Sequence, residues 1–388
     1  MSRHIIAHTS ASAIADPRVI KEADSLTAAG YRVTVLAWDR GGDTPEQLVM
    51  PGGWMLERVG RPTSHGAGIR NLDAYRDYWR EATRRTVALG ADAVHCHNLD
   101  TVPIGLAVGC RTGHRVSLVA DFHEVYRESR ALPQRGAAGV LARTAARLLE
   151  LLTIRKAALL ITAVDSQVDY YRDLGARDVL VIDNAPDAGR YTPVVRDEPE
   201  FVVSFIGQKR LLSALENLMF AVQRLPSVRA LLVGGGPAQT DVERIAHEME
   251  RVEVSGRIEP DAIPELYRRC DAVYACYDAD LFHWRTAFPV KVMEAMACAL
   301  PVVVTEGTYI GDYVEAHGLG FAVDHHDVDA IAAAIAALEG DRAASHAMGR
   351  RGREIIEREL NWPVMAQRLV SRYDALFERK ADGIQYRD

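Results

Sequence analysis

The chain has 388 residues, a formal net charge of -7 and 48% hydrophobic residues. This length is too great for one compact core, so two domains of nearly equal size are expected. The acidic net charge gives no sign of the basic surface that most nucleic-acid-binding proteins have. Nucleic acid is therefore not an expected partner. The five cysteines form no C-x-x-C pair, and their odd number favours a reduced, cytoplasmic protein without structural zinc.

No segment is expected to direct the chain out of the cytoplasm or across a membrane. The N-terminal segment, MSRHIIAHTSASAIADPR, holds too short an apolar run for a signal peptide. No stretch approaches the roughly 18 apolar residues of a membrane span. Peripheral contact with a membrane surface stays open.

Short apolar runs alternate with longer amphipathic segments in the first half of the sequence. Strands are expected at 4–9, 31–38, 91–98, 115–124, 158–164 and 178–184, and helices at 16–30, 137–156 and 166–176. The first helix has a capping residue in Asp16, a proline at its first position in Pro17, and a terminal glycine in Gly30.

The alternation breaks after Asn184. Residues 185–200 are rich in proline and charge and have no period, so a linker is expected there. The alternation then restarts, with a short helix expected at 264–269. Strands are expected at 201–207, 228–236, 252–258, 271–277 and 301–305, and the last helices at 327–339, 342–359 and 363–379.

Strands that are apolar on both faces and alternate with helices predict parallel sheets covered by helices. We expect an α/β fold of two Rossmann-like, doubly wound parallel-sheet domains that face a cleft, over 1–184 and 201–362. Ligands of such sheets bind beyond the carboxyl ends of the strands. The residues just after each strand are therefore the candidates for function.

The first strand end of the second half suits a phosphate. Gly207 lets the backbone approach a ligand, and Lys209 and Arg210 precede a helix, where their charge and the helix dipole both favour an anion. A solvated Lys–Arg pair is the alternative. The run GGGP at 234–237 lacks the last glycine of a dinucleotide fingerprint and predicts a tight turn.

The segment FPVKVMEAMACALPVVVT, at 288–305, places a charged pair where a buried element begins. Pro289 suits a first helical turn, which puts Lys291 and Glu294 three residues apart on one face. The lysine can meet a phosphate, and the glutamate can accept hydrogen bonds from two vicinal hydroxyls, as on a ribose. Taken alone, Glu294 could simply complement the helix dipole.

The order of these motifs resembles the C-terminal domain of retaining glycosyltransferases of family 4, which have the GT-B fold. The resemblance rests on GQKR, LLVGGGP, VSGRI, PELYRRCDAVYACY, PVKVMEAMACALPVVVT and HGLGFAV. In the first half, the N-terminal strand–helix–strand run, DAVHCHNLDTVPIG and VADFHEVY resemble members that make polysaccharides and glycosylated natural products. The resemblance implies that the last helix, within 363–388, returns to the first domain.

The resemblance implies a nucleotide-sugar donor on the second domain. Thr286 stands where the family has the first glutamate of its E-x7-E motif, and the chain departs from the family there. The expected donor residues are Lys209, Arg210 and Lys291 for the diphosphate, Glu294 for the ribose, Arg257 and Ile258 for the base, and Thr286 and Gly207 near the sugar.

The first domain is implied to bind the acceptor. The family places a histidine beside the reacting sugar where this sequence has His123, in DFHE, so His123 is the expected catalytic residue. A structural histidine at a strand end is the alternative. His97 and Asp100 are further acceptor candidates, and Asp16 is another, although the helix cap explains it better. The sequence does not distinguish three classes of acceptor: a saccharide, an aminocyclitol or other natural product, and a lipid-linked saccharide.

No D-x-D motif stands at a strand end, although DAD at 278–280 has the spacing. Two or more cations can replace a metal as the clamp on a leaving diphosphate, so metal-independent transfer is expected. Retention of anomeric configuration is implied by the resemblance alone. The basic Arg/Leu/Ala helix at 135–156 could lie on a membrane surface, but domain packing is the favoured interpretation.

Two other functions fit parts of the sequence. A non-hydrolysing nucleotide-sugar epimerase would need carboxylates around the reacting carbons, and Thr286 argues against one. A non-catalytic sugar-nucleotide-binding partner of a second transferase is consistent with the absent glutamate.

Overall fold

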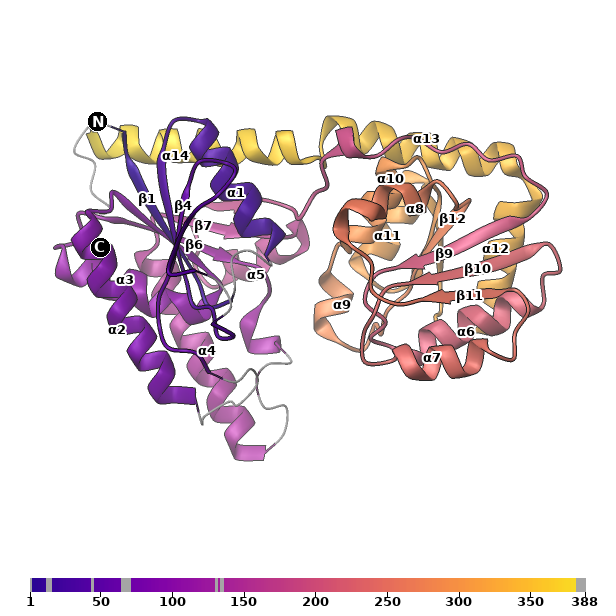
Figure 1. Ribbon diagram of the computed structural model, residues 1–388, viewed down its shortest axis with the longest axis horizontal. Coiled ribbons are helices and arrows are strands. Elements are labelled where there is room, and N and C mark those ends of the chain that lie inside the picture. Colours follow the sequence, from indigo (N-terminus) through magenta and orange to yellow (C-terminus); the bar gives the residue numbers. More distant parts are fainter. Residues whose placement is uncertain are drawn as a thin grey trace. The chain divides into compact units, whose positions relative to one another are not determined.

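The computed structural model describes residues 2–11, 16–42, 45–63, 71–129, 132 and 136–381 (Figure 1). The chain divides into two compact units. The first comprises Met1–Asn184 and Met365–Asp388, and the second comprises Ala185–Val364. Residue 135, at the start of the expected basic helix, and residues 382–388 of the expected last helix lie outside the described residues.

The first unit is built on an eight-stranded sheet of order β3-β4-β2-β1-β5-β6-β7-β8. Neighbours pair in parallel except β3 with β4, which are antiparallel. The strands are β1 (His4–Thr9), β2 (Arg32–Ala37), β3 (Gln47–Val49), β4 (Met55–Arg58), β5 (Ala93–His97), β6 (Ser117–Phe122), β7 (Leu159–Thr162) and β8 (Val179–Val181). The sequence pattern does not predict β3 and β4, because their apolar runs, 48–50 and 54–56, hold only three residues each and are separated by Pro51, Gly52 and Gly53.

Six helices accompany this sheet in the described part of the first unit. They are α1 (Pro17–Ala28), α2 (Leu72–Leu89), α3 (Val102–Arg111), α4 (Gly136–Lys156), α5 (Val168–Asp173) and α14 (Trp362–Ala381), which belongs to this unit from Met365 onward. Asp16 caps α1, as expected, because its side chain accepts hydrogen bonds from the backbone N–H groups of Arg18 and Val19.

The second unit has a six-stranded parallel sheet of order β11-β10-β9-β12-β13-β14. Its core lies where these strands pack against α6, α7 and α12. The strands are β9 (Phe201–Ile206), β10 (Val228–Val233), β11 (Val252–Ser255), β12 (Ala272–Ala275), β13 (Val302–Thr305) and β14 (Gly320–Val323). The helices are α6 (Leu212–Gln223), α7 (Gln239–Ala246), α8 (Ile263–Tyr267), α9 (Phe282–Thr286), α10 (Val290–Ala297), α11 (Tyr309–His317), α12 (Val328–Gly340) and α13 (Arg342–Arg358).

The two sheets confirm the expected α/β class of two parallel-sheet domains. The segment 185–200, expected as a linker, is grouped with the second unit. Within it, the backbone N–H of Val194 donates to the carbonyl of Cys298 over 2.7 Å.

Each sheet has a point where the chain changes direction. In the first sheet β1 has β2 on one side and β5 on the other, and in the second sheet β9 lies between β10 and β12. Ligands of open α/β sheets bind beyond the carboxyl ends of strands at such a switch point. These ends carry His97 and its neighbours in the first unit, and Gly207 and Tyr277 in the second.

Candidate functional site

Three glycines let the loops after β9 and β10 touch each other. Gly207, Gly234 and Gly236 have φ angles of 141°, 121° and 139°, which side-chain-bearing residues rarely adopt. A Cβ on Gly234 would lie 2.1 Å from the Gly207 carbonyl oxygen, and a Cβ on Gly236 would lie 2.5 Å from the Lys209 carbonyl oxygen. The GGGP run is therefore a tight turn packed on the neighbouring strand end.

Lys209 ties these loops together. Its side chain is fully buried. The ammonium donates to the carbonyl oxygens of Gly234 and Ser255, the latter over 2.8 Å, and to Gln239 Oε1 over 2.9 Å. Because an ammonium has three N–H donors, these bonds use all of them. Burial lowers the pKa of Lys209 to about 8. In this structure Lys209 holds the loops together, and its expected contact with the diphosphate stays a prediction.

Lys291, on α10, is also nearly buried, with 8% of its surface exposed. Its Nζ lies 3.2 Å from the centroid of the Phe205 ring and 5.3 Å from that of Tyr277, at the ends of β9 and β12. Among the described residues, no hydrogen-bond acceptor or carboxylate pairs with this ammonium. A Cβ on Gly207 would lie 3.2 Å from Nζ, so the glycine leaves room beside it.

Burial and the neighbouring charges act together on the ammonium of Lys291. Burial lowers the pKa of Lys291 well below its ordinary value, the Glu294 carboxylate opposes this, and the nearby Lys209 and Arg210 lower the pKa further. Arg210 is exposed, and its Nε donates to Gln208 Oε1 over 2.8 Å. Cations that gather around an unpaired buried ammonium make a site that favours an anion.

Glu294 lies one turn beyond Lys291 and is held by two tyrosines. Tyr191 donates its hydroxyl proton to Oε1 over 2.8 Å, and Tyr267 donates to Oε2 over 2.9 Å. Burial, with the adjacent Glu294 carboxylate, raises the pKa of both tyrosines, so both hydroxyls stay protonated donors. Each carboxylate oxygen accepts one of these bonds, and the pair of bonds orients the Glu294 side chain.

The other expected donor residues lie around this edge of the second sheet. Arg257 is exposed, and its Cβ would be 3.7 Å from a Cβ on Gly235, so it stands beside the glycine turn. Ile258 is half-buried. Thr286 ends α9, and its hydroxyl donates to the Phe282 carbonyl over 3.0 Å, within its own helix. Two ring systems stack nearby: Tyr277 and Trp284, 4.0 Å apart.

In the first unit, Asp121 is the centre of a buried charge network. Arg18 donates from Nη2 to Oδ1 over 2.7 Å and from Nε to Oδ2 over 2.8 Å. His97 Nδ1 and His123 Nε2 lie 3.2 and 3.3 Å from Oδ2. Burial alone would raise the pKa of Asp121, but Arg18 and His123 outweigh it and hold this pKa well below its usual range.

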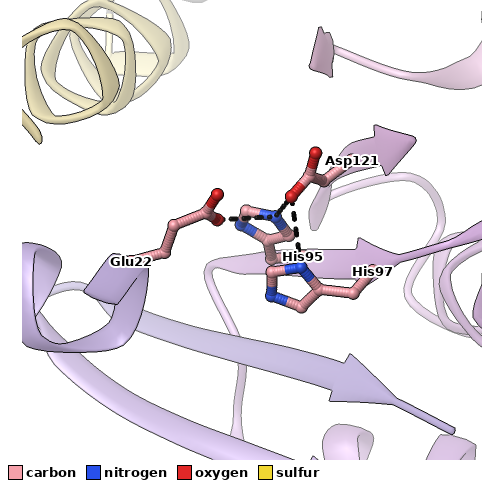
Figure 2. A group of neighbouring side chains, drawn as sticks. All are labelled: Glu22, His95, His97 and Asp121. Atoms are coloured by element: carbon pink, nitrogen blue, oxygen red, sulfur yellow. Dashed lines mark hydrogen bonds and ion pairs between the residues drawn. The ribbon is translucent and has the colours of Figure 1, made fainter. Parts of the chain in front are cut away.

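Glu22 and His95 extend the network inward, and Figure 2 shows their side chains directed toward His97 and Asp121. Glu22 Oε1 lies 3.1 Å from Arg18 Nε, and Glu22 Oε2 lies 3.4 Å from His95 Nε2. Burial, and then the charge of Asp121, raise the pKa of Glu22 well above its usual range. His95 Nδ1 is 2.8 Å from the hydroxyl of Tyr373, on α14.

Four buried residues carry donor atoms of the kinds that bind transition metals, and these atoms all lie within 4.8 Å of one another. The four are Glu22, His95, His97 and Asp121. The Arg18 guanidinium, however, already lies within 3.1 Å of both carboxylates. A divalent cation there would be repelled by this fixed positive charge. The arrangement therefore fits a hydrogen-bonded charge network better than a metal centre.

His123 is the member of the network with substantial exposure. Its side chain is 20% exposed, whereas those of His97 and Asp121 are 2% and 0% exposed. His97 is stacked on His95, and burial lowers the pKa of His97 to about 3. His123 is therefore accessible to a ligand, whereas His97 is buried and contacts other members of the network.

The remaining acceptor candidates have structural partners. Asp16 caps α1. Asp100 accepts a hydrogen bond from the Tyr75 hydroxyl over 3.4 Å, and burial raises its pKa. Asn98, just after β5, has a φ of 70° and donates its N–H to the Asp121 carbonyl over 2.8 Å. Such strain in a residue other than glycine is frequent at functional sites, and nothing in the sequence pattern predicts it.

Two family profiles match the chain. The profile described as "Glycosyl transferase 4-like domain" matches residues 17–185, and "Glycosyl transferases group 1" matches residues 195–355. The chain belongs to the family 4-type glycosyltransferases of the GT-B fold.

Two of the curated relatives to which this chain is similar have names that include inositol-containing molecules. The chain is 28% identical over 169 residues to the GDP-mannose-dependent alpha-(1-6)-phosphatidylinositol monomannoside mannosyltransferase of Mycobacterium tuberculosis, covering 42% of this chain and 43% of that one. It is 28% identical over 243 residues to D-inositol 3-phosphate glycosyltransferase of Salinispora tropica, covering 55% and 49%. The match spans less than half the length of each relative.

Solved structures show the same fold. Sucrose-phosphate synthase from Thermosynechococcus elongatus superposes with a TM-score of 0.78 at 18% identity, covering 97% of this chain and 99% of that one. HepE from Anabaena, in complex with UDP and glucose, superposes with a TM-score of 0.70 at 19% identity, covering 96% and 100%.

Proposed function

We propose that this glycosyltransferase moves a sugar from a nucleoside-diphosphate sugar to a hydroxyl group of its acceptor. The observation that carries the proposal is the nearly buried ammonium of Lys291, which has no anionic partner among the described residues and lies at a switch point of the sheet. A diphosphate supplies the missing charge. A relative whose name includes GDP-mannose and a structural neighbour solved with UDP support this choice.

The second unit holds the donor in this proposal. Lys291 and the exposed Arg210 bind the diphosphate, and Glu294, oriented by two tyrosines, accepts hydrogen bonds from the ribose hydroxyls. Arg257 and Ile258 lie beside the base. Thr286 and Gly207 lie near the sugar, and Thr286 offers the sugar a smaller, uncharged side chain than a glutamate would.

The first unit holds the acceptor, and His123 is the residue that contacts the reacting groups. Asp121 positions its ring through Nε2. Transfer proceeds with retention: the bond from the anomeric carbon to the diphosphate oxygen breaks, and the acceptor oxygen bonds to the same face. The acceptor proton leaves with the diphosphate. Saccharides, aminocyclitols and lipid-linked saccharides are the acceptors to screen.

Transfer is metal-independent in this proposal, because Lys291 and Arg210 supply the positive charge at the leaving group. Turnover of the donor should therefore be unchanged after dialysis against EDTA. The measurement is release of nucleoside diphosphate with and without added Mg²⁺ or Mn²⁺. Loss of turnover in EDTA that either ion restores would contradict this part of the proposal.

The deciding experiment is a thermal-shift screen with UDP, GDP and TDP. We expect one nucleotide to raise the melting temperature, because a ligand that binds the folded state stabilises it. Glu294→Ala should abolish most of this shift, and the matched variant Glu248→Ala, at an exposed glutamate between α7 and β11 and away from the carboxyl ends of the strands, should retain it. No stabilisation by any nucleotide would overturn the proposal.

A second candidate, a non-catalytic partner that binds the sugar nucleotide, is favoured by Thr286, whose hydroxyl is engaged within α9. Nucleotide stabilisation without donor turnover across the acceptor screen would support this candidate. Conversion of the donor sugar with no acceptor present would instead indicate an epimerase.

A further inference from the structure

The helix α4 presents an apolar face to solvent. Leu141, Leu148 and Leu152 are 71%, 61% and 46% exposed. Because a helix has 3.6 residues per turn, spacings of seven and eleven residues bring these three side chains onto one face. We call these three residues the leucine ridge. The sequence favours packing of this helix against the domain, but these leucines are not the side chains that pack.

The opposite face of α4 is fixed to the first unit. Glu150 is buried there and accepts hydrogen bonds from the Tyr126 backbone N–H over 3.1 Å and from the Tyr170 hydroxyl over 2.7 Å. The residues buried along this face are Gly139, Ala146, Glu150, Thr153 and Ile154. Rotation of the helix to hide the leucine ridge would break the bonds to Glu150, so the ridge stays outward.

The outward face of α4 is also positively charged. Arg155 and Lys156 are exposed on either side of the leucine ridge, whereas the one carboxylate of the helix, Glu150, faces inward. The whole chain carries a net charge of -7. A basic and apolar face on an acidic protein is a local feature that points to one kind of partner.

We infer that the outward face of α4 docks on an anionic lipid surface. The cations would meet the headgroups while the leucines enter the boundary of the acyl chains. A second copy of the chain is a poorer occupant, because pairing α4 with α4 about a two-fold axis would oppose like charges. The contact is interfacial: none of the helices in the described ranges has the length and apolarity needed to span a bilayer.

The inference is tested by sedimenting the full-length protein with vesicles of phosphatidylcholine, with and without phosphatidylglycerol. We expect binding only to vesicles that contain phosphatidylglycerol, and weaker binding as sodium chloride is raised. The L141Q/L148Q/L152Q variant should lower the partition coefficient by at least about tenfold, because three apolar side chains no longer enter the interface.

The matched control is V49Q/L72Q/V87Q, which changes three exposed apolar residues of the same unit outside α4. This variant should bind vesicles like the wild type. If the leucine-ridge variant does not fold, as judged by circular dichroism, R155Q/K156Q serves as the second variant and should weaken the preference for phosphatidylglycerol.

Three results would overturn the inference. One is equal sedimentation of wild type and both α4 variants, and another is no sedimentation of the wild type. The third is a wild-type dimer in lipid-free buffer that the leucine-ridge variant disperses, which would assign the face to a second copy. Nucleotide-dependent stabilisation should be unchanged in the leucine-ridge variant, so failure of the docking inference is distinguishable from failure of the proposed donor site.

Discussion

Lys209 and Lys291 are both removed from solvent, yet the structure gives their ammonium groups opposite surroundings. Lys209 donates to three acceptors, which are Gly234 after β10, Gln239 at the start of α7 and Ser255 at the end of β11. Lys291 faces two aromatic rings and has no acceptor among the described residues. A buried charge without a hydrogen-bond partner destabilises the folded state, whereas hydrogen bonds to a buried charge offset this cost. The two lysines should therefore respond differently to the same substitution.

Lys291→Met should weaken binding of the nucleoside diphosphate by about 10- to 100-fold, because a charged contact to the phosphate is lost. The melting temperature of the Lys291→Met variant without ligand should stay the same as that of the wild type or rise. Lys209→Met should lower the free energy of unfolding by about 3 kcal/mol, because buried acceptors lose their donor. Titration calorimetry and urea unfolding measure the two effects, and a reversed pattern would refute both assignments.

His123→Ala should slow sugar transfer by about 100-fold or more, a size usual for a lost proton-transfer or orienting group. The dissociation constant of the nucleotide should not change, because His123 belongs to the first unit. Transfer rates and nucleotide titrations separate the two quantities. A variant with wild-type turnover would remove His123 from the mechanism.

Asp121→Asn is the companion to this experiment. It keeps the shape of the side chain but removes the negative charge that Arg18 and His123 share. Breaking a buried ion pair from one side costs about 3 kcal/mol of stability, so this variant should be both less stable and slower. Slower transfer in the folded fraction would identify Asp121 as a positioning residue, and normal transfer there would limit it to stability.

At the scale of elements, the loops after β9 and β10 depend on glycine because their backbones touch. Gly234→Ala should lower the free energy of unfolding by about 3 kcal/mol or more, since its Cβ would overlap the Gly207 carbonyl and its φ of 121° is strained for alanine. Urea unfolding gives the value. Gly256→Ala, where no atom lies within 4 Å of the added Cβ, should change stability by no more than about 0.5 kcal/mol.

The sequence predicts most elements and the edge of each sheet that carries the polar groups, because apolar periodicity and strand-end positions are local. Lys291 and Glu294 share a helical face that spacing alone predicts. The inward turn of Lys209 is not predictable, because its three acceptors lie 25 to 46 residues away in the sequence. Tyr191 is missed for a related reason: it stands in a segment whose proline and charge predict a linker, and only the fold brings it to Glu294.

For the whole molecule, buried histidines predict how stability depends on pH. His8 is fully buried, and burial, followed by the neighbouring His97 and His95, lowers its pKa to about 3. Between this value and the ordinary pKa near 6.5, the unfolded chain binds a proton that the folded chain does not. Stability attributable to His8 therefore falls as the pH drops below about 6.5.

His8→Gln should reduce this dependence. A glutamine can still hydrogen-bond Thr86, which lies 3.0 Å from His8 Nε2, but it does not titrate. The free energy of unfolding should fall less steeply with decreasing pH in the variant, by about 1.4 kcal/mol per pH unit for one proton. Urea unfolding at several values between pH 7 and pH 5 gives both slopes, and identical slopes would exclude His8 as a source of the dependence.

The placement of α14 has a consequence for biosynthesis. Tyr373 reaches His95 from a helix that is translated after the entire second unit. At roughly 5 to 20 residues per second, about 10 to 40 s separate the emergence of the first sheet from that of its final helix. During that interval the nascent chain has His95 without Tyr373, and the surface that α14 later covers is exposed. Chaperones that bind exposed apolar surface therefore have their longest opportunity to bind the first unit.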